Sequence, residues 1–187
     1  MKKKIIITGG LGYIGTELCK LYSGVSWHHK ITVIDNRFIS ERVNQIRNWN
    51  MEFIQGDILD KDLIKKYCAD ADVVHHLAGV TTVPRTKSES SLSQDKKIKE
   101  VGEKGTQNIL EVISDKCKII FPSTHVVYEG INEVKKDIKE SEITKPVLSY
   151  STSKAINEEQ LKKSGKNYVI LRLGSVYGYS TDSMRID

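Results

Sequence analysis

The sequence predicts a doubly wound parallel α/β sheet, and three observations carry that prediction. Apolar strand patterns alternate with helical patterns along most of the 187 residues. The first strand pattern, residues 5–7, runs into three glycines and then directly into a helical pattern. The second strand pattern ends on an acidic residue, Asp35, twenty positions after the last of these glycines. Strands of a parallel sheet are buried on both faces, so they read as short continuous apolar runs.

The elements follow from the period of the apolar residues. Strands are expected at residues 5–7, 31–34, 51–54, 72–77, 118–121 and 168–171. Helices are expected at residues 13–22, 42–49, 61–67, 92–114 and 150–163. Gly102 and Gly105 should weaken the fourth helix locally, because glycine is a poor helix former. The polar segments 23–30, 81–91 and 130–146 are expected to be loops.

The glycines have the spacing G-x-x-G-x-x-G. Gly9 permits a tight turn out of the strand, Gly12 lets backbone approach a pyrophosphate, and Gly15 lets the helix pack closely on the sheet. The phosphates would lie at the helix N-terminus, where free N–H groups and the helix dipole favour negative charge. Glycines also serve ordinary turns, but a strand before, a helix after and an acid about 20 residues on favour a dinucleotide site.

Three further positions fit a dinucleotide. Asp35 can accept both ribose hydroxyls of the adenosine and would repel a 2′-phosphate, which favours NAD over NADP, although Arg37 could soften this preference. Asp57 can contact the adenine amino group or cap the following helix. Ala78 and Gly79 follow the strand expected beside the first one, and their small size would let the cofactor pass closely.

Bulk composition is that of a globular protein, with 39% hydrophobic and 28% charged residues. The net charge of +5 comes from scattered lysines, and no basic stripe interleaved with aromatic residues indicates nucleic-acid binding. Three isolated cysteines, Cys19, Cys68 and Cys117, fit a reducing cytoplasm better than a disulfide framework. The apolar run after the N-terminal lysines is too short for a signal peptide, and no stretch approaches the ~20 apolar residues of a membrane span.

No metal site is expected. His75 and His76 are adjacent in a strand and therefore point to opposite faces. No second cluster of histidine, cysteine or acidic residues has the spacing of metal ligands.

Tyr150 and Lys154 form a Y-x-x-x-K pair whose members share one face of a helix. The lysine ammonium favours the phenolate and lowers the pKa of the tyrosine from its usual value of about 10. Such a tyrosine can remove a proton from a sugar hydroxyl while hydride leaves the same carbon. A surface pair on an amphipathic helix is the simpler interpretation of the motif by itself. Ser123 and Thr124, at the carboxyl end of a strand where doubly wound sheets bind ligands, favour the catalytic one.

In these motifs, taken in order, the chain resembles the extended short-chain dehydrogenase/reductase family, among the NAD-dependent nucleotide-sugar epimerases and dehydratases. The matching segments are residues 9–15, 35–36, 56–58, 76–79, 123–128, 150–154 and 172–178. The resemblance implies a Rossmann fold and a catalytic triad of Thr124, Tyr150 and Lys154. It also implies cofactor contacts from Gly9, Gly12, Tyr13, Ile14, Gly15, Asp35, Asn36, Asp57, Ile58, Leu77, Ala78, Gly79, Tyr150 and Lys154.

Departures from the family pattern refine the expected reaction. Dehydratases and decarboxylating members resemble S-T-D-E-V-Y or S-T-S-E-V-Y, whereas this chain has His125 and Val126 between the triad hydroxyl and V-Y. Valine cannot move a proton, which argues against 4,6-dehydration and favours C4 epimerisation, although His125 could act as a base. The family often has asparagine where this chain has Gly102 and Ser175, which leaves the sugar undetermined.

The resemblance implies an NAD-dependent nucleotide-sugar epimerase acting by transient oxidation and hydride return. A reductase or dehydratase of the same family, or a non-catalytic NAD-binding module, is the alternative. Family members continue into a C-terminal region that grips the nucleotide diphosphate, so residues 1–187 are expected to form a single NAD-binding domain with much of the substrate region absent. The substrate would be a nucleotide-diphosphate sugar. A homodimer through the helices at 92–114 and 150–163 is also expected.

Overall fold

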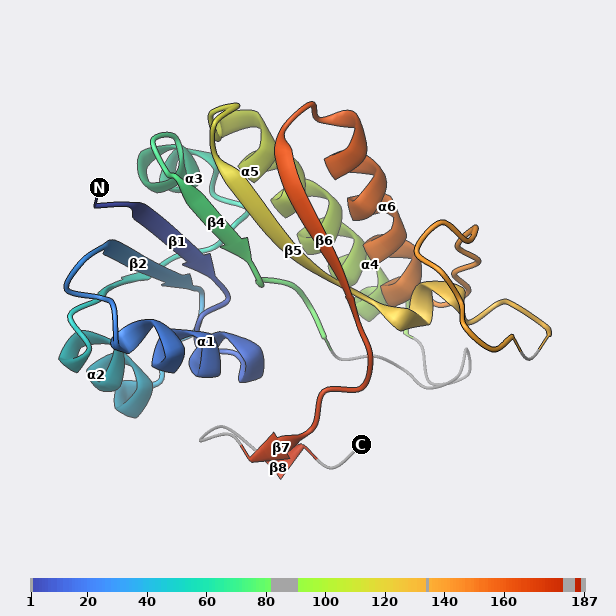
Figure 1. Cartoon of the computed structure of the whole chain (residues 1–187), viewed down its shortest axis with the longest axis horizontal. Helices are drawn as coiled ribbons and strands as arrows, with labels where there is room; N and C mark the ends of the chain where they lie inside the picture. Colours follow the sequence, from blue (N-terminus) through green and yellow to red (C-terminus); the bar gives the residue numbers. More distant parts are fainter. Residues whose placement is uncertain (1, 82–90, 134, 180–183, 186–187) are drawn as a thin grey trace.

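The computed structural model describes residues 2–81, 91–133, 135–179 and 184–185. Six parallel strands form one sheet in the order β3-β2-β1-β4-β5-β6 (Figure 1). The strands are β1 Lys4–Thr8, β2 Lys30–Asp35, β3 Glu52–Gln55, β4 Val73–His76, β5 Lys118–Thr124 and β6 Asn167–Leu173. The chain winds outward from β1 to β3 and then returns to place β4 on the other side of β1, which confirms the doubly wound prediction.

The side chains of β1 explain why this strand is central. Ile5 and Ile7 pack with Val33 into one buried cluster, while Ile6, between them, packs into the other with Val74. Successive residues of a strand point to opposite faces, so both faces of the sheet need an apolar cover.

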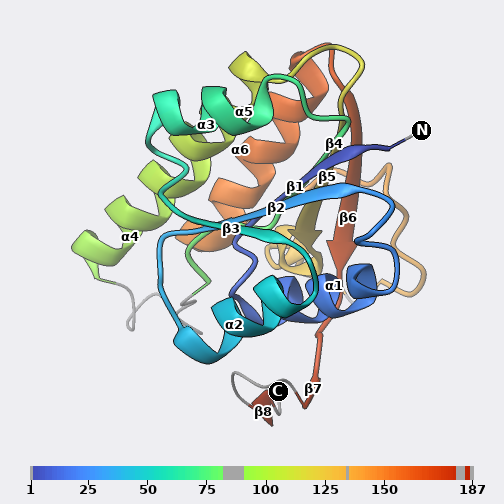
Figure 2. The ribbon, with the colours of Figure 1, turned by 90° about the vertical axis from the view of Figure 1, so that its left-hand side faces the viewer.

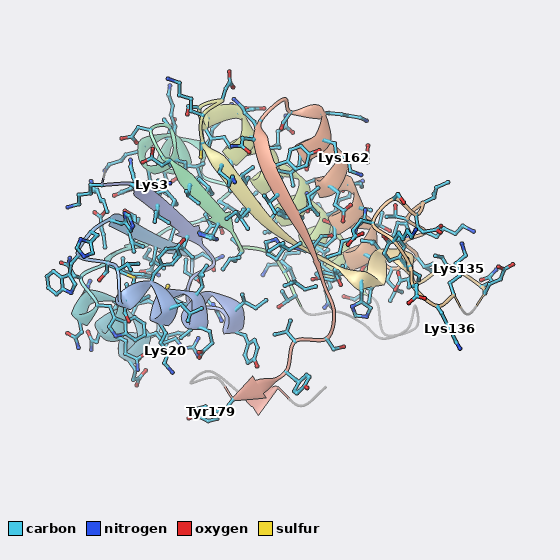
Figure 3. All side chains as sticks on the ribbon, viewed as in Figure 1. Lys3, Lys20, Lys135, Lys136, Lys162 and Tyr179 are labelled. Carbon is cyan, nitrogen blue, oxygen red and sulfur yellow. The ribbon has the colours of Figure 1, made fainter. Side chains whose placement is uncertain are left out.

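Helices provide that cover in two layers. The helices are α1 Tyr13–Ser23, α2 Ser40–Asn48, α3 Lys61–Cys68, α4 Leu92–Lys99, α5 Gly105–Val112 and α6 Ser149–Lys163. Figure 2 shows α1 and α2 on one side of the sheet and α3, α4, α5 and α6 on the other. The lysines labelled in Figure 3 are spread over several sides of this fold.

The helix predicted over residues 92–114 contains a π-helical turn. A π-helical turn, Glu100–Lys104, separates α4 from α5. A Cβ on Gly102 would overlap the Ser153 hydroxyl of α6, so the glycine allows the two helices to approach closely. Asn157 donates from Nδ2 to the Gly102 carbonyl at 3.0 Å, and Gln160 donates to the Glu103 carbonyl at 3.1 Å. The helical run therefore extends over residues 92–112, close to the predicted 92–114, and it widens into a π-helical turn at the glycine where local weakening was expected.

The side of β6 that faces away from α6 is less covered. Arg172 reaches Glu158 of α6, and alternation therefore directs Leu171 to the opposite side, where it is 43% exposed. Beyond β6, the short strands β7 Gly178–Tyr179 and β8 Met184–Arg185 pair antiparallel, and the Tyr13 hydroxyl donates to the Gly178 carbonyl at 2.8 Å. Neither short strand was predicted.

All three cysteines are free and buried. No helix of the described residues has the length and apolar character needed to cross a membrane.

Candidate cofactor and catalytic site

The glycine-rich loop between β1 and α1 has the predicted conformation. Gly9 has a φ of +70°, and a Cβ there would lie 2.6 Å from the backbone nitrogen of Ala78. A Cβ on Gly15 would lie 2.6 Å from the Gly10 Cα. Both contacts are with backbone, which cannot move aside easily, so glycine is required to seat the loop and the first turn of α1 against the end of β4.

The N-terminus of α1 is suited to an anion. Gly12 is its N-cap, no side chain caps the helix, and no acidic residue lies in its first turn. A helix start of this kind leaves N–H groups and the positive end of the dipole available to a pyrophosphate. On the other side of the crevice, a Cβ on Gly79 would meet nothing within 4 Å. These features fit the diphosphate of a dinucleotide.

Asp35 is buried at the end of β2 and holds the loop in place. Its Oδ2 accepts a hydrogen bond from the Leu11 N–H at 2.9 Å. Its Oδ1 accepts from the Arg37 N–H at 3.0 Å and from Arg37 Nε at 3.3 Å. Asp35, the predicted ribose acceptor, therefore also anchors the glycine-rich loop of residues 9–12, the nucleotide loop. Arg37 lies next to it, as the sequence suggested.

Asp57 lies beside Asn36, whose Nδ2 donates to Asp57 Oδ2 at 3.0 Å. The other carboxylate oxygen accepts from the Leu59 N–H at 2.9 Å. The suggested role of Asp57 as a helix cap was wrong, since Asp60 caps α3 by accepting from the N–H groups of residues 62 and 63. Asp57 instead orders the turn that follows β3.

The remaining predicted cofactor residues differ in what their side chains can reach. Ile58 is buried in the core, and it fills the space where Gly105 has no side chain. Tyr13 donates to the Gly178 carbonyl, and Ile14 is 36% exposed at the start of α1. Leu77 lies half-buried at the end of β4 and packs against the core of the α1 side.

The three predicted triad residues come from two adjoining elements. Thr124 ends β5, and its Oγ1 accepts a hydrogen bond from the Val126 N–H at 3.3 Å. Tyr150 lies in the first turn of α6, and Lys154 follows one turn later. The Lys154 Nζ lies 5.9 Å from the centroid of the Tyr150 ring and donates to the Pro122 carbonyl at 2.9 Å. Burial lowers the pKa of Lys154 to about 8.

The structure separates the two adjacent hydroxyls at the end of β5. Ser123 Oγ donates to Glu158 Oε1 of α6 at 2.6 Å and is buried. Successive side chains of a strand alternate, so Thr124 points to the other side. Ser123 therefore belongs to the packing of α6 on the sheet. The structure does not bring the Thr124 side chain into the cavity lined by Tyr150 and Lys154, so its substrate contact stays a prediction from the family resemblance.

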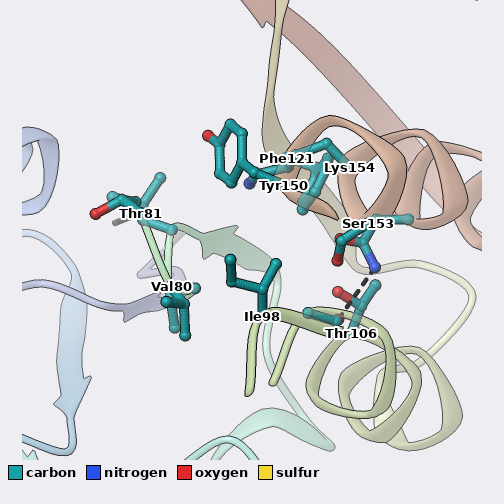
Figure 4. Close-up of a pocket in the computed structure, with 13 residues that line it drawn as sticks. Val80, Thr81, Ile98, Thr106, Phe121, Tyr150, Ser153 and Lys154 are labelled. Atoms are coloured by element: carbon teal, nitrogen blue, oxygen red, sulfur yellow. Dashed lines mark hydrogen bonds between the residues drawn. The ribbon is translucent and has the colours of Figure 1, made fainter. Parts of the chain in front are cut away.

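Figure 4 shows a cavity that is lined by Tyr150 and Lys154 of the predicted triad but not by Thr124. Tyr150, Ser153 and Lys154 of α6 line it from one side, and Ile98 and Thr106 line it from the opposing helices. The segment after β4 closes the remaining side with residues 77–81. The cavity thus joins the predicted catalytic helix to the strand end beside the nucleotide loop.

Two carboxylates of this region were missed by the sequence analysis. Glu158 is fully buried, and it lies one turn beyond Lys154 on the same helix face, so its four-residue spacing could have revealed it. Glu129 accepts hydrogen bonds through Oε1 from the Val147 and Leu148 N–H groups, each at 2.7 Å. Glu129 also accepts from the Ser151 hydroxyl, and it holds the start of α6, whose N-cap residue has no side-chain cap. No local sequence pattern indicates that Glu129 contacts the start of α6.

The two adjacent histidines point to opposite faces, as predicted. The ring of His75 contacts the Tyr22 hydroxyl at 2.8 Å. The ring of His76 lies between Thr8 and Thr106, each at 3.0 Å. Within the described residues, no group of three or more histidine, cysteine or acidic side chains could hold a metal ion.

The fold and the loop define a dinucleotide-binding α/β protein, and comparison with known proteins gives its family. Residues 5–186 match the model of the NAD dependent epimerase/dehydratase family, and the chain belongs to this family. NAD is the cofactor on which this family depends.

Among curated relatives, a putative UDP-glucose 4-epimerase from Methanocaldococcus jannaschii is 33% identical, with 95% of this chain and 57% of the relative covered. A dTDP-D-glucose 4,6-dehydratase from Dictyostelium discoideum is 29% identical, with 94% of this chain and 44% of the relative covered. This chain therefore spans about half the length of the curated relatives it matches.

Two solved structures of 4-epimerases are also similar to this chain in fold. A UDP-glucuronic acid 4-epimerase from Bacillus cereus, with NAD bound, superimposes with a TM-score of 0.79 at 28% identity, covering 95% of this chain and 58% of that one. A UDP-N-acetylglucosamine 4-epimerase from Methanobrevibacter ruminantium superimposes with a TM-score of 0.74 at 31% identity, covering 92% of this chain and 55% of that one.

Proposed function

We propose that the protein epimerises C4 of a nucleotide-diphosphate sugar, with NAD as cofactor. The observation that carries the proposal is the meeting of two elements at the carboxyl edge of the sheet. Lys154 of α6 donates to the Pro122 carbonyl, two residues before Thr124 at the end of β5, and the cavity lined by Tyr150 and Lys154 reaches the end of β4. Ligands of doubly wound sheets bind in this crevice.

NAD, when bound, supplies the chemistry of reversible hydride transfer at C4 of the sugar. Gly9, Gly12 and Gly15 would hold its diphosphate at the start of α1. Asp35 would accept the adenosine ribose hydroxyls, and Asp57 would lie at the adenine end. Residues 77–79 would border its path across the edge of the sheet.

The chain's own groups would handle the proton. Tyr150 would remove the proton from the C4 hydroxyl. After the ketosugar has rotated so that its other face points to the cofactor, the Tyr150 phenol would return the proton. The charged Lys154 would stabilise the phenolate, because an ammonium nearby favours the negative form of the tyrosine. Thr124 would orient the sugar oxygen with its hydroxyl.

The residues after Thr124 favour epimerisation over dehydration. Val126 stands where the dehydratase pattern has a glutamate, and valine cannot transfer a proton. His125 is exposed, and its Nδ1 lies 3.2 Å from the Leu173 carbonyl. A carbonyl only accepts, so Nδ1 carries the proton in this contact and Nε2 is the remaining basic nitrogen. Because Val126 cannot transfer a proton, a dehydratase would have to use Nε2 of His125 as the acid or base near C5 and C6 of the sugar.

The test is turnover of UDP-, dTDP- and GDP-hexoses, followed by chromatography of the products. Epimerised sugar should appear, and Tyr150→Phe should abolish turnover while NAD still binds. Tyr168→Phe, on the far edge strand, is the matched control and should leave turnover unchanged. Release of a dehydrated product, or net consumption of reduced cofactor, would instead indicate a dehydratase or a reductase. Because the chain spans about half the length of its relatives, we expect weak turnover from residues 1–187 by themselves.

A homodimer through α4, α5 and α6 stays a prediction. Among the described residues, Leu92 is the only large apolar side chain exposed on these helices, at 91%. An interface formed there would consequently be largely polar. Light scattering at micromolar concentration should give twice the chain mass, and a strictly monomeric mass would contradict the prediction.

A further inference from the structure

The Lys154 ammonium lies over an aromatic ring that the proposed reaction does not use. Its Nζ is 4.4 Å from the centroid of Phe121, which is nearer than the ring of Tyr150 at 5.9 Å. Phe121 is almost fully buried in the middle of β5, and the carbonyl of the next residue, Pro122, accepts a hydrogen bond from the same ammonium. None of the ion pairs formed by the described residues involves Lys154.

The ring of Phe121 is itself held by a buried histidine. The rings of His76 and Phe121 lie 5.7 Å apart, tilted by 39°. Hydrogen bonds at both ring nitrogens fix His76, to Thr8 at the end of β1 and to Thr106 of α5. Burial, and then the charge of Lys154, lower the pKa of His76 to about 3, so the imidazole is neutral at physiological pH and adds no second cation.

We propose that Phe121 is a positioning residue for Lys154, and that its ring face holds the ammonium beside Tyr150 by a cation–π interaction. His76 fixes the ring from the side of the nucleotide loop. Lys154 is half-buried, and a cation partly withdrawn from water needs compensation, which the quadrupole of an aromatic face supplies where no carboxylate is paired. The link to catalysis rests on the proposed function, whereas the contact itself can be tested without turnover.

The Phe121 ring contacts both the Lys154 ammonium and the neutral ring of His76. Among the residues that the structure describes, the titratable groups found near Lys154 are Tyr150 of α6 and His76 of β4. A charged His76 would repel the ammonium. Because His76 stays neutral, the ring face of Phe121 and the Pro122 carbonyl are the groups that stabilise the positive charge.

The experiment is an NMR titration of the Lys154 side chain in the ligand-free chain labelled at lysine Cε. The Lys154→Arg spectrum identifies the signal by its absence. Phe121→Leu should lower the pKa of Lys154 by about one unit, the size expected for a desolvated cation–π contact. Phe121→Tyr keeps the ring face and should leave the pKa of Lys154 where it is in the wild type. Phe53→Leu, which removes a ring from β3, is the matched control and should also cause no shift.

If Phe121→Leu does not fold, Phe121→Met replaces it, since the unbranched side chain fills a similar volume without a ring. An unchanged or raised pKa in the leucine or methionine variant would overturn the proposal and assign Lys154 to the Pro122 carbonyl alone. The same titration would be valid if no sugar were turned over, so failure of the proposed function and failure of this inference are separate results.

Discussion

Glu158 and Arg172 form a two-point ion pair between α6 and β6. Arg172 Nε donates to Oε1 at 2.9 Å, and its second terminal nitrogen donates to Oε2 at 2.6 Å. Ser123 donates to the same Oε1, and Arg172 also donates to the Tyr128 hydroxyl and to the Glu140 carbonyl at 2.9 Å. The buried Glu158 carboxylate thus joins α6 to β5 and β6, and Arg172 extends the network to residues that follow β5.

Removing this carboxylate should cost stability. Glu158→Ala leaves a guanidinium and a hydroxyl without their partner in a largely buried place, and breaking such a pair costs about 3–5 kcal/mol. Urea unfolding followed by circular dichroism measures the loss. Glu159→Ala is the matched control, because the neighbouring carboxylate pairs with Lys162 at the surface and should matter little. Equal midpoints for the two variants would contradict the structural role of Glu158.

Acid should destabilise the protein through its buried histidines. Burial lowers the pKa of His76 to about 3 and that of His75 to about 4, from an ordinary value of 6.5. At a pH between the lowered pKa of each histidine and 6.5, the unfolded chain binds a proton that the folded chain does not. The free energy of unfolding therefore falls as the pH drops below about 6.5. Each histidine contributes a slope of up to about 1.4 kcal/mol per pH unit.

Unfolding free energies measured from pH 7 to pH 4 test this. His76→Gln should reduce the slope, although the variant itself will be less stable at pH 7. His28→Gln, at an exposed position, is the control and should leave the slope unchanged. A slope that is the same in wild type and in the His76 variant would exclude His76 as its origin.

NAD should bind more tightly than NADP, and Asp35 should set the difference. Its carboxylate would repel a 2′-phosphate, and Arg37 at 3.3 Å offsets only part of that charge. Asp35→Asn should reduce the NAD preference at least tenfold, or about 1.4 kcal/mol. Calorimetry with both cofactors provides the dissociation constants, and Asp62→Asn, at an exposed position of α3, serves as the control. Tighter binding of NADP by the wild type would refute the assignment of Asp35.

Gly15→Ala should weaken both folding and cofactor binding. The new Cβ would lie 2.6 Å from the Gly10 Cα, so the nucleotide loop or the start of α1 must shift. Overpacking of this kind costs about 1–3 kcal/mol. Gly24→Ala is matched to it, since a Cβ there meets nothing within 4 Å and its backbone is already helical. Thermal unfolding and NAD calorimetry should separate the two variants, and identical behaviour would count against a tightly seated loop.

The sequence by itself determined the class of fold and the shape of the glycine-rich loop where the cofactor is predicted to bind. β1 and β2 are short apolar runs whose burial is dictated by their composition, and the glycine spacing with Asp35 at its end depends only on local geometry. The Y-x-x-x-K spacing likewise places Tyr150 and Lys154 on one helix face, whatever that face packs against. Each of these patterns lies within one element or one turn, where distance along the chain limits distance in space.

The tertiary structure alone decided which groups surround that site. Glu158 binds Ser123 from 35 residues away, and Lys154 lies over Phe121 from 33 positions along the chain. The π-helical turn at Gly102 within the long helix also involves α6, whose Asn157 supplies a donor to the Gly102 carbonyl. Contacts of this kind are set by the packing of α6 on the sheet, because side chains distant in sequence meet only when whole elements come together, and no local pattern specifies which of them will touch.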